Sequence, residues 1–533
     1  MTTVRDAAFE LFRARGMTTI FGNPGSTELP MLGPLPEDFR YVLGLQEAVA
    51  VGMADGFAQA SANITHVNLH TAPGVGNGVG AIFNARANRA PLLVTAGQQA
   101  RSLMTMQATL TNRDAVEVPK PFVKWSYEPP RAADVPFALA QAIHHATLPP
   151  AGPAFVSIPM DDWLAEVEPV DYASQIARTV GGRAQPDPEQ IKALAERVRA
   201  ARRPVFVAGP DIDASGGWDA AIELVEAQRL PVWASPPTGG SRIGFPESHP
   251  AFQGVLPPAV APVAEALAGH DLVLVAGSSV FPYYPNIPGN FLPDGAELVA
   301  ITSDPDEAAR APMGDAIVAD VALTLRALVG ELGEPSGREP PPTRVEFEPP
   351  PGGDQLSGGE VHGVLAELFP ADGIVVLESP SSTAALRNKL RLSRPGSYYF
   401  SASGGLGFGL SAAVGVQLAQ PERQVVCVLG EGSAQYAITA FWTAAAYDVP
   451  VKFLVLRNHE YSILKWFASL ENVTGAPALD LPHLDVAATA RSYGVPSITA
   501  SGREELHDGL GDALGQDGPR LVQVDVAPGM ALA

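Results

Sequence analysis

The sequence predicts an α/β protein made of three doubly wound parallel-sheet domains. Its 533 residues are too many for one hydrophobic core. Short apolar runs alternate with stretches of helical periodicity, as in parallel strands joined by crossover helices. The alternation is interrupted twice, at the polar residues 167–188 and at the proline- and glycine-rich residues 334–354. We therefore expect domains at about residues 1–180, 181–340 and 341–533.

The composition favours an enzyme that acts on small molecules. A net charge of -22 argues against nucleic acid or an anionic membrane surface as a partner. The single cysteine, Cys427, lies in an apolar run and has no second cysteine to form a disulfide with. No apolar run approaches the length of a membrane span, and the first residues lack the pattern of a signal peptide. These features predict a cytoplasmic protein.

The first predicted strands end at candidate ligand-binding residues. The strand at residues 19–21 leads into a small loop that can expose Ser26, although a plain turn in which Ser26 caps a helix is the alternative. After the strand at residues 41–45, Glu47 opens an apolar helix. Glu47 is either an acid favoured by the helix dipole or a buried functional carboxylate that needs a partner, and the local sequence leaves both open.

The next strand, residues 67–69, ends in His70 before a glycine-rich segment. That position suits a ligand-binding histidine, but a structural histidine is the more common case. A strand at residues 91–96 completes this sheet. Beyond it, residues 107–112 are predicted to form a lid or pocket segment that carries Leu110.

The second segment contains strands at residues 204–208 and 272–276. It resembles half of a dinucleotide-binding fold but lacks the GxGxxG motif, so a bound dinucleotide is unsupported. An aromatic loop, residues 277–284, follows the second strand and ends at Tyr284. The loop either reaches a neighbouring site or packs within its own domain.

The third segment begins with a strand at residues 374–377 and a helix-opening turn that contains Ser381. An aromatic strand at residues 398–400 leads into the glycine-rich residues 401–410. Glycines let a backbone approach a flat ligand closely. Leu406 is then the one bulky side chain that this loop presses against such a ligand.

The rest of the third segment is organised around a strand, a glycine-rich turn and a second strand. The strand at residues 425–428 precedes Gly-Glu-Gly-Ser at residues 430–433, and a strand at residues 451–456 follows. Glu431 and Asn458 therefore fall at the carboxyl ends of two parallel strands, where open α/β sheets bind ligands.

This pattern predicts a site for a hard cation and a phosphate group. One carboxylate, one amide oxygen and main-chain carbonyls suit Mg²⁺ or Ca²⁺. Ser433 is expected to cap a helix over residues 434–447, whose start suits a phosphate. The alternative is an ordinary strand, turn and helix in which Glu431 is merely solvated.

The Gly-Glu-Gly-Ser motif followed by Asn458 resembles the metal–diphosphate motif of thiamine diphosphate (ThDP) enzymes, which normally reads GDG…N. Here Glu431 stands in place of the usual aspartate. Much longer stretches resemble benzoylformate decarboxylases, among them FGNPGSTELP, LQEAVAVGMADGFAQA, NLHTAPGVGNGVGA and GGLGFGLSAAVGVQLAQPERQ. The resemblance covers nearly the whole chain. It implies a pyrimidine-binding, a middle and a diphosphate-binding domain, and decarboxylation of an aromatic 2-keto acid.

The resemblance also implies roles for individual residues. Glu47 would bond N1′ of the ThDP pyrimidine, Ser26 the substrate carboxylate, and His70 would transfer protons. Glu431, Asn458 and the main-chain carbonyl of Glu460 would bind the metal. The remaining cofactor contacts map onto small and polar residues: Ser381, Gly404, Leu406, Gly432, Ser433 and Tyr461. An aryl pocket maps onto four apolar residues: Leu110, Phe400, Leu464 and Phe467.

In this family Glu47 and the metal motif meet across a dimer interface, usually within a tetramer. The resemblance therefore implies that this chain forms a dimer of dimers.

One active-site position departs from the family. Tyr284 aligns with a second active-site histidine of benzoylformate decarboxylases. Tyrosine can donate a hydrogen bond but cannot act as a cationic acid. Slow protonation after carbon dioxide leaves would give time for capture by a second aldehyde and hence a 2-hydroxy ketone. A carboligase or lyase of the benzoin or acetolactate type is therefore the alternative.

Two further hypotheses concern the function. The sequence disfavours the first, and the colour of the purified protein would test the second. A non-catalytic subunit with the same fold is disfavoured because Glu47 and the metal ligands are all present. An acetolactate synthase-like enzyme would often carry FAD in the middle domain, which would colour the purified protein yellow.

Overall fold

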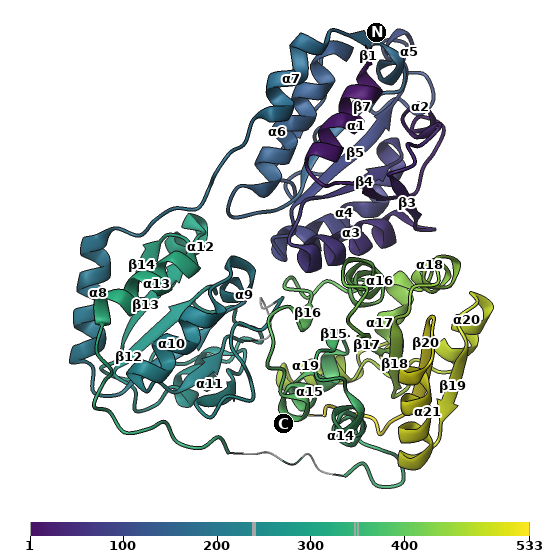
Figure 1. Ribbon diagram of the computed structural model, residues 1–533. Helices are drawn as coiled ribbons and strands as arrows, with labels where there is room; N and C mark the ends of the chain where they lie inside the picture. The colour runs from purple at the N-terminus through teal and green to yellow at the C-terminus, as the bar shows by residue number, and fades with distance from the viewer. Residues whose placement is uncertain (1, 237–240, 346–347, 349–350, 532–533) are drawn as a thin grey trace.

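The computed structural model describes residues 2–236, 241–345, 348 and 351–531. Within these residues the chain forms three six-stranded parallel sheets, each covered by helices in a lobe of its own (Figure 1). The first lobe is purple, the second teal and the third green to yellow in the figure. The predicted fold class is therefore confirmed.

The first lobe contains the sheet with strand order β3-β2-β4-β5-β7-β6. Its strands are β2 (Thr19–Gly22), β3 (Arg40–Leu43), β4 (Thr65–Leu69), β5 (Leu92–Gln98), β6 (Trp125–Tyr127) and β7 (Ala154–Pro159). Its helices are α1 (Val4–Ala14), α2 (Leu29–Leu32), α3 (Glu47–Ser61), α4 (Thr71–Ala87), α5 (Arg101–Met104), α6 (Val135–Thr147) and α7 (Pro169–Ala177). A short antiparallel pair, β1 (Thr2–Thr3) and β8 (Glu166–Val167), joins its two ends.

The second lobe has strand order β11-β10-β9-β12-β13-β14, the order of dinucleotide-binding folds. Its strands are β9 (Pro204–Ala208), β10 (Val232–Ala234), β11 (Phe252–Val255), β12 (Leu272–Ala276), β13 (Glu297–Thr302) and β14 (Asp315–Val318). Its helices are α8 (Pro188–Ala200), α9 (Asp211–Ser215), α10 (Trp218–Gln228), α11 (Val260–Ala266), α12 (Pro305–Arg310) and α13 (Val321–Leu332).

The third lobe has strand order β16-β15-β17-β18-β20-β19. Its strands are β15 (Ile374–Glu378), β16 (Tyr398–Phe400), β17 (Val425–Gly430), β18 (Lys452–Arg457), β19 (Ser497–Ala500) and β20 (Arg520–Asp525). Its helices are α14 (Gly358–Leu368), α15 (Thr383–Leu390), α16 (Gly409–Ala419), α17 (Glu431–Ala434), α18 (Ala440–Ala446), α19 (Ser462–Leu470), α20 (Val486–Ser492) and α21 (Arg503–Gly515). Counted along the chain, its strands are arranged as in the first lobe, a kinship that the sequence did not reveal.

The helix expected over residues 434–447 is broken into shorter pieces. Helix α17 begins at Glu431 and is followed by a 3-10 turn, Gln435–Ala437, before α18. Gly430 takes the extended cap conformation and Ser433 lies inside α17, so the predicted cap at Ser433 is wrong. The helix starts early because Gly430, the last residue of β17, is itself the cap of α17.

The first and third lobes share one continuous core through α3 and α16 (Figure 1). Small residues allow the two helices to approach closely. A Cβ atom on Gly52 would lie 2.1 Å from Ser411 Oγ, and one on Gly415 would lie 1.9 Å from the main-chain oxygen of Met53. Larger residues would therefore push the helices apart. This contact also brings α4 beside the loop that enters α16.

The second and third lobes are joined by the segment predicted as an extended linker. It has no helix or strand where it is described, and residues 346–347 and 349–350 of it lie outside the described residues. No helix in the described ranges is long and apolar enough to cross a membrane.

Candidate active site

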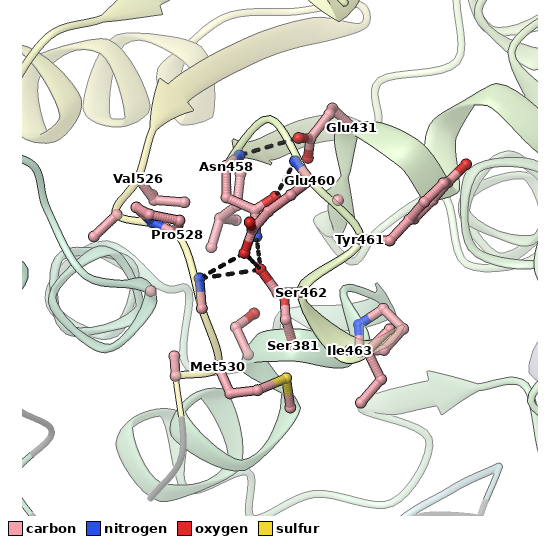
Figure 2. A pocket seen from close by; sticks show the side chains of 18 of the residues that line it. Ser381, Glu431, Asn458, Glu460, Tyr461, Ser462, Ile463, Val526, Pro528 and Met530 are labelled. Atoms are coloured by element: carbon pink, nitrogen blue, oxygen red, sulfur yellow. Dashed lines mark hydrogen bonds between the residues drawn. The ribbon is translucent and has the colours of Figure 1, made fainter. Parts of the chain in front are cut away.

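The third lobe contains a pocket of about 310 Å³ at the carboxyl ends of its central strands. Strands β17 and β18 run parallel with Gly430 paired to Leu456, so the residues after them meet at one edge of the sheet. Figure 2 shows this pocket, with Asn458 lying between Glu431 and Ser462. Eight predicted site residues line it: Ser381, Leu406, Glu431, Gly432, Ser433, Asn458, Glu460 and Tyr461.

Glu431 is a buried carboxylate, 2% exposed, held by the turn after β18. Its Oε1 accepts hydrogen bonds from the main-chain nitrogens of Asn458 (3.1 Å) and His459 (2.6 Å). Burial raises the pKa of Glu431, and these backbone hydrogen bonds partly offset the shift. Among the described residues it has no cationic side chain in an ion pair. A carboxylate in this position is stabilised by a cation.

The side chains of Asn458 and Glu460 organise the same turn. Asn458 donates from Nδ2 to Ser462 Oγ (2.7 Å), and its Oδ1 accepts from the main-chain nitrogen of Glu460 (3.2 Å). The Glu460 carboxylate accepts from Ser462 Oγ (2.6 Å) and the main-chain nitrogen of Gly529 (2.9 Å), and it pairs with Lys465. Burial opposes ionisation, but the hydrogen bonds from Lys465 and Ser462 lower the pKa of Glu460. Because the Glu460 side chain is committed to the turn, its carbonyl is the group suited to a metal.

The pocket fits a diphosphate bound through a divalent cation. Hydroxyl groups line it at Ser357, Ser381, Ser382, Ser433, Tyr461 and Ser462. No lysine or arginine is among its described lining residues, so protein charge alone would repel a diphosphate from Glu431. Oxygen ligands suit Mg²⁺ or Ca²⁺, which would bridge the carboxylate to phosphate oxygens. Gly432 is required beside Tyr461, because a Cβ atom there would lie 2.6 Å from the tyrosine ring.

Glu47 lies in the first lobe, away from this pocket. It begins α3, is buried, and accepts hydrogen bonds from Asn23 Nδ2 (3.2 Å) and Asn77 Nδ2 (3.1 Å). Two neutral amides thus hold the carboxylate in place without neutralising it. These partners could not be predicted from the sequence, because Asn23 and Asn77 are far from Glu47 along the chain. The partner that we expected for Glu47 is therefore a pair of amides.

His70 is held by a carboxylate that we did not predict. Its Nδ1 lies 2.8 Å from Glu28 Oε2, and Glu28 is fully buried. Glu28 also accepts from the main-chain nitrogens of Gly25 and Gly97, each at 2.8 Å. Gly25 must be glycine, because a Cβ atom there would lie 2.1 Å from His70 Nδ1. Ser26 is exposed on the same loop. The sequence did contain one signal for this partner of His70: Glu28 lies two residues after Ser26, a candidate ligand-binding residue.

The predicted aryl-pocket residues come from two lobes of the chain. Leu464 and Phe467 lie on α19, Phe400 ends β16, and Leu110 belongs to the first lobe. Tyr284 reaches across from the second lobe, with its ring centroid 4.7 Å from that of Phe467. None of these residues lines the third-lobe pocket, and neither does Gly404, which is exposed with a φ of 72°. Ile463, which we did not predict, does line it.

Three family models of thiamine pyrophosphate enzymes match the chain. The N-terminal TPP binding domain matches residues 2–118, the central domain residues 191–328 and the C-terminal TPP binding domain residues 381–524. Among characterised relatives, benzoylformate decarboxylase of Pseudomonas aeruginosa is 51% identical over 98% of this chain and 99% of its own length. The acetolactate synthase isozyme 3 large subunit of Escherichia coli is more distant, 28% identical over 96% of this chain and 92% of its own.

Solved structures agree with these relatives. The thiamine diphosphate-dependent 4-hydroxybenzoylformate decarboxylase of Rhodococcus jostii RHA1 superposes with a TM-score of 0.95 at 46% identity, covering 99% of each chain. The benzoylformate decarboxylase of Polynucleobacter necessarius gives a TM-score of 0.96 at 39% identity, covering 100% of each chain. The resemblance found in the sequence is confirmed: the chain belongs to the benzoylformate decarboxylase family of thiamine pyrophosphate enzymes.

Proposed function

We propose that the chain is a ThDP-dependent decarboxylase that converts benzoylformate, or a ring-substituted benzoylformate, to an aldehyde and carbon dioxide without oxidation. The names of the relatives at 51% and 46% identity support this substrate class. The observation that carries the proposal is the hydroxyl-lined pocket in which Glu431 and Asn458 meet. That pocket suits a diphosphate held through a metal, since its described lining contains carboxylates and hydroxyl groups but neither lysine nor arginine.

The third lobe would hold the cofactor and its metal. Glu431, Asn458 and the Glu460 carbonyl would bind the cation. Hydroxyl groups and main-chain nitrogens from the same pocket would contact the diphosphate: Ser381, Gly432, Ser433 and Tyr461. Magnesium is the proposed ion, with calcium as the alternative, because Glu431 is one methylene longer than aspartate and Ca²⁺ tolerates irregular ligand geometry better. Leu406 and the Gly404 carbonyl would support the rings.

The first lobe would supply the acid–base groups. Bound ThDP supplies the electron sink that accepts the electron pair released as carbon dioxide leaves. Glu47, which accepts hydrogen bonds from Asn23 and Asn77, would bond the pyrimidine N1′. Because Nδ1 of His70 is bonded to Glu28, Nε2 is its free ring nitrogen for moving a proton to or from the substrate. Ser26 would bind the substrate carboxylate.

Both halves leave apolar side chains exposed, which supports completion of the site by a second copy. On the third-lobe side, Leu464 is 45% exposed and Tyr284 from the second lobe is 58% exposed. On the first-lobe side, Met106 is 68% exposed, and Leu103 beside it is also exposed. Exposed apolar groups at both halves favour burial against a partner. We propose a dimer in which each Glu47 serves the partner's pocket, with two dimers forming a tetramer.

The organisation of the chain is proposed on similar grounds. Domain boundaries near residues 180 and 340 are supported by the irregular segments between α7 and α8 and between α13 and α14. A cytoplasmic location is supported by Cys427, which is buried and is the single cysteine.

Carboligation is the second candidate, and Tyr284 is the observation that favours it. Tyr284 stands against Phe467, where a cationic acid would have protonated the reacting carbon. A slower proton transfer gives a second aldehyde time to react, with a 2-hydroxy ketone as product.

One assay tests both proposals. The purified protein with ThDP and Mg²⁺ is incubated with benzoylformate, then with benzoylformate plus benzaldehyde, and carbon dioxide, benzaldehyde and benzoin are quantified. Carbon dioxide matched by benzaldehyde supports the decarboxylase. Benzoin as the main product supports the carboligase. A parallel incubation with pyruvate tests the substrate class, and carbon dioxide release from pyruvate but not from benzoylformate would overturn the aryl substrate.

A further inference from the structure

The loop at residues 401–408 positions Leu406, yet it has no helix or strand of its own. Leu406 lines the third-lobe pocket, and Gly404 and Gly407 on either side of it have φ angles of 72° and 97°. Such a loop has many accessible conformations, because glycine restricts the backbone least. Its conformation must therefore be fixed by side chains from outside the loop.

Glu378 holds the loop at its exit. This residue ends β15 and is 2% exposed. Its Oε1 accepts from the main-chain nitrogens of Gly407 (2.7 Å) and Phe408 (3.1 Å), and its Oε2 from that of Gly409 (3.1 Å). Burial raises the pKa of Glu378 to about 8, although the three amides act in the opposite direction. Both carboxyl oxygens are thus committed to the end of the loop and the start of α16.

Two asparagines hold the first half of the loop: Asn84 lies in α4, and Asn88 is the residue that caps the C-terminal end of α4. Asn84 Nδ2 donates to the main-chain oxygen of Gly405 (3.2 Å), and the Ser403 hydroxyl donates to Asn84 Oδ1. Asn88 Oδ1 accepts from the main-chain nitrogen of Ala402 (2.8 Å). A Cβ atom on Gly405 would lie 2.2 Å from Asn84 Oδ1, so loop and asparagine fit each other closely.

These asparagines belong to the first lobe, whereas the loop belongs to the third. Both are buried, and Asn88 Nδ2 is itself fixed by Asp55 Oδ2 at 2.8 Å. Helix α4 also carries Asn77, two turns before Asn84, and Asn77 bonds Glu47. One helix therefore contacts both the candidate acid Glu47 and the loop that carries Leu406.

We propose that Asn84, Asn88 and Glu378 are positioning residues that hold Leu406 in the cofactor pocket. Asn84 and Asn88 act across the contact between the first and third lobes, and Glu378 acts within the third. None of them lines the pocket, so they act through the loop. The proposal rests on the proposed function for the identity of the ligand, but the hydrogen bonds that hold the loop do not depend on it.

The test compares Asn84→Ala with a matched control, Gln523→Ala. Gln523 is also a fully buried amide, and its Oε1 accepts from the main-chain nitrogens of Val486 (3.0 Å) and Ala487 (3.1 Å). It contacts neither the loop nor Leu406 through these bonds, and it is not a lining residue of the pocket. Hydrogen exchange of the amides at residues 402–409 is measured on each apoprotein. The dissociation constant for ThDP is then measured at saturating Mg²⁺ by quenching of tryptophan fluorescence.

Asn84→Ala is expected to speed exchange across the loop and to weaken ThDP binding, each about 10-fold, the effect of losing one or two net hydrogen bonds. Gln523→Ala is expected to lower the melting temperature but to leave loop exchange and ThDP affinity unchanged. Glu378→Asp keeps the carboxyl group but draws it back by one methylene, and it should reproduce the Asn84→Ala result. If Asn84→Ala fails to fold, the Glu378→Asp variant is measured in its place.

Loop exchange equal to that of the parent protein would overturn the proposal. So would faster exchange with unchanged ThDP affinity, because the loop would then have no part in holding the cofactor. A parent protein that binds no ThDP at all would overturn the proposed function, and with it the role of Leu406. In that case loop exchange still decides whether Asn84 and Glu378 hold the loop.

Discussion

The two halves of the candidate site are built in opposite ways. In the third lobe, one strand–turn–helix unit and its neighbour enclose a pocket of about 310 Å³ whose described lining comes entirely from residues 351–531. In the first lobe, Glu47 and His70 are held by side chains from distant parts of the chain. The third lobe thus gathers its candidate site residues around one pocket, whereas in the first lobe Glu47 and His70 are fixed by hydrogen bonds and do not line that pocket.

The carboxylates show the difference most clearly. Glu431 is buried against backbone amides with no cationic partner among the described residues, and the proposed metal would supply the missing positive charge. Glu47 and Glu28 are already satisfied by neutral donors, so their geometry is set before any ligand arrives. Binding and chemistry should therefore be separable by mutation, and the following experiments test that separation.

Removal of the metal should have the largest effect. Dialysis against EDTA should abolish both ThDP binding and carbon dioxide release, because no lysine or arginine among the described lining residues could replace the ion. Addition of Mg²⁺ should restore both, and Asn458→Ala should require far more Mg²⁺ to do so. ThDP affinity that survives chelation would contradict the metal-bridged pocket.

Among variants that still bind ThDP normally, Glu47→Gln should show the largest loss of kcat. We expect kcat to fall by about 10²–10⁴-fold, the usual contribution of a positioned acid or base. The dissociation constant for ThDP should change little, since the diphosphate is anchored elsewhere. Steady-state kinetics and fluorescence titration measure the two quantities, and an equal loss in both would mean that the halves are not separable.

Glu28→Gln should lower kcat by about 10-fold, because His70 would lose the carboxylate that fixes its Nδ1. The pH profile of kcat should shift as well, which a purely structural defect would not cause. Glu128→Gln is the matched control, since Glu128 also accepts side-chain hydrogen bonds in the first lobe, from Gln98 (3.0 Å) and Ser157 (2.7 Å). Equal effects of the two variants would remove Glu28 from the mechanism.

Tyr284→His should have the smallest effect. Restoring a histidine at this position should raise aldehyde release a few-fold and reduce any benzoin, because imidazolium can donate a proton where tyrosine donates only a hydrogen bond. Tyr284→Phe keeps the ring against Phe467 and separates packing from proton transfer. Product analysis by chromatography measures both, and an unchanged ratio would exclude Tyr284 from the proton-transfer step.

Local patterns in the sequence predicted the third lobe better than the first. The strands around Glu431 and Asn458 were placed correctly because buried parallel strands are continuous apolar runs. The partners of Glu47 and His70 were missed because Asn23, Asn77 and Glu28 come from other segments. Contacts between distant segments leave no periodic signal in one sequence.

Other features that the sequence analysis predicted wrongly or did not predict have different physical causes. The cap expected at Ser433 was wrong because Gly430 already takes the cap geometry, which propensity alone could not show. The hydrogen bonds between Asn84 and the loop at residues 401–408 were not predicted, because they depend on how the first and third lobes pack together. The roles of the individual site residues and the domain boundaries stay predictions.

We propose that each active site combines Glu47 and His70 of one copy of the chain with the metal ligands Glu431 and Asn458 of another copy. Mixing Glu47→Gln and Asn458→Ala subunits by co-expression tests this most directly. Each variant alone should be nearly inactive, and random mixing should restore about a quarter of the sites, because half of the dimers then contain one intact site. Carbon dioxide release no higher than that of the separate variants would show instead that both halves act within a single chain.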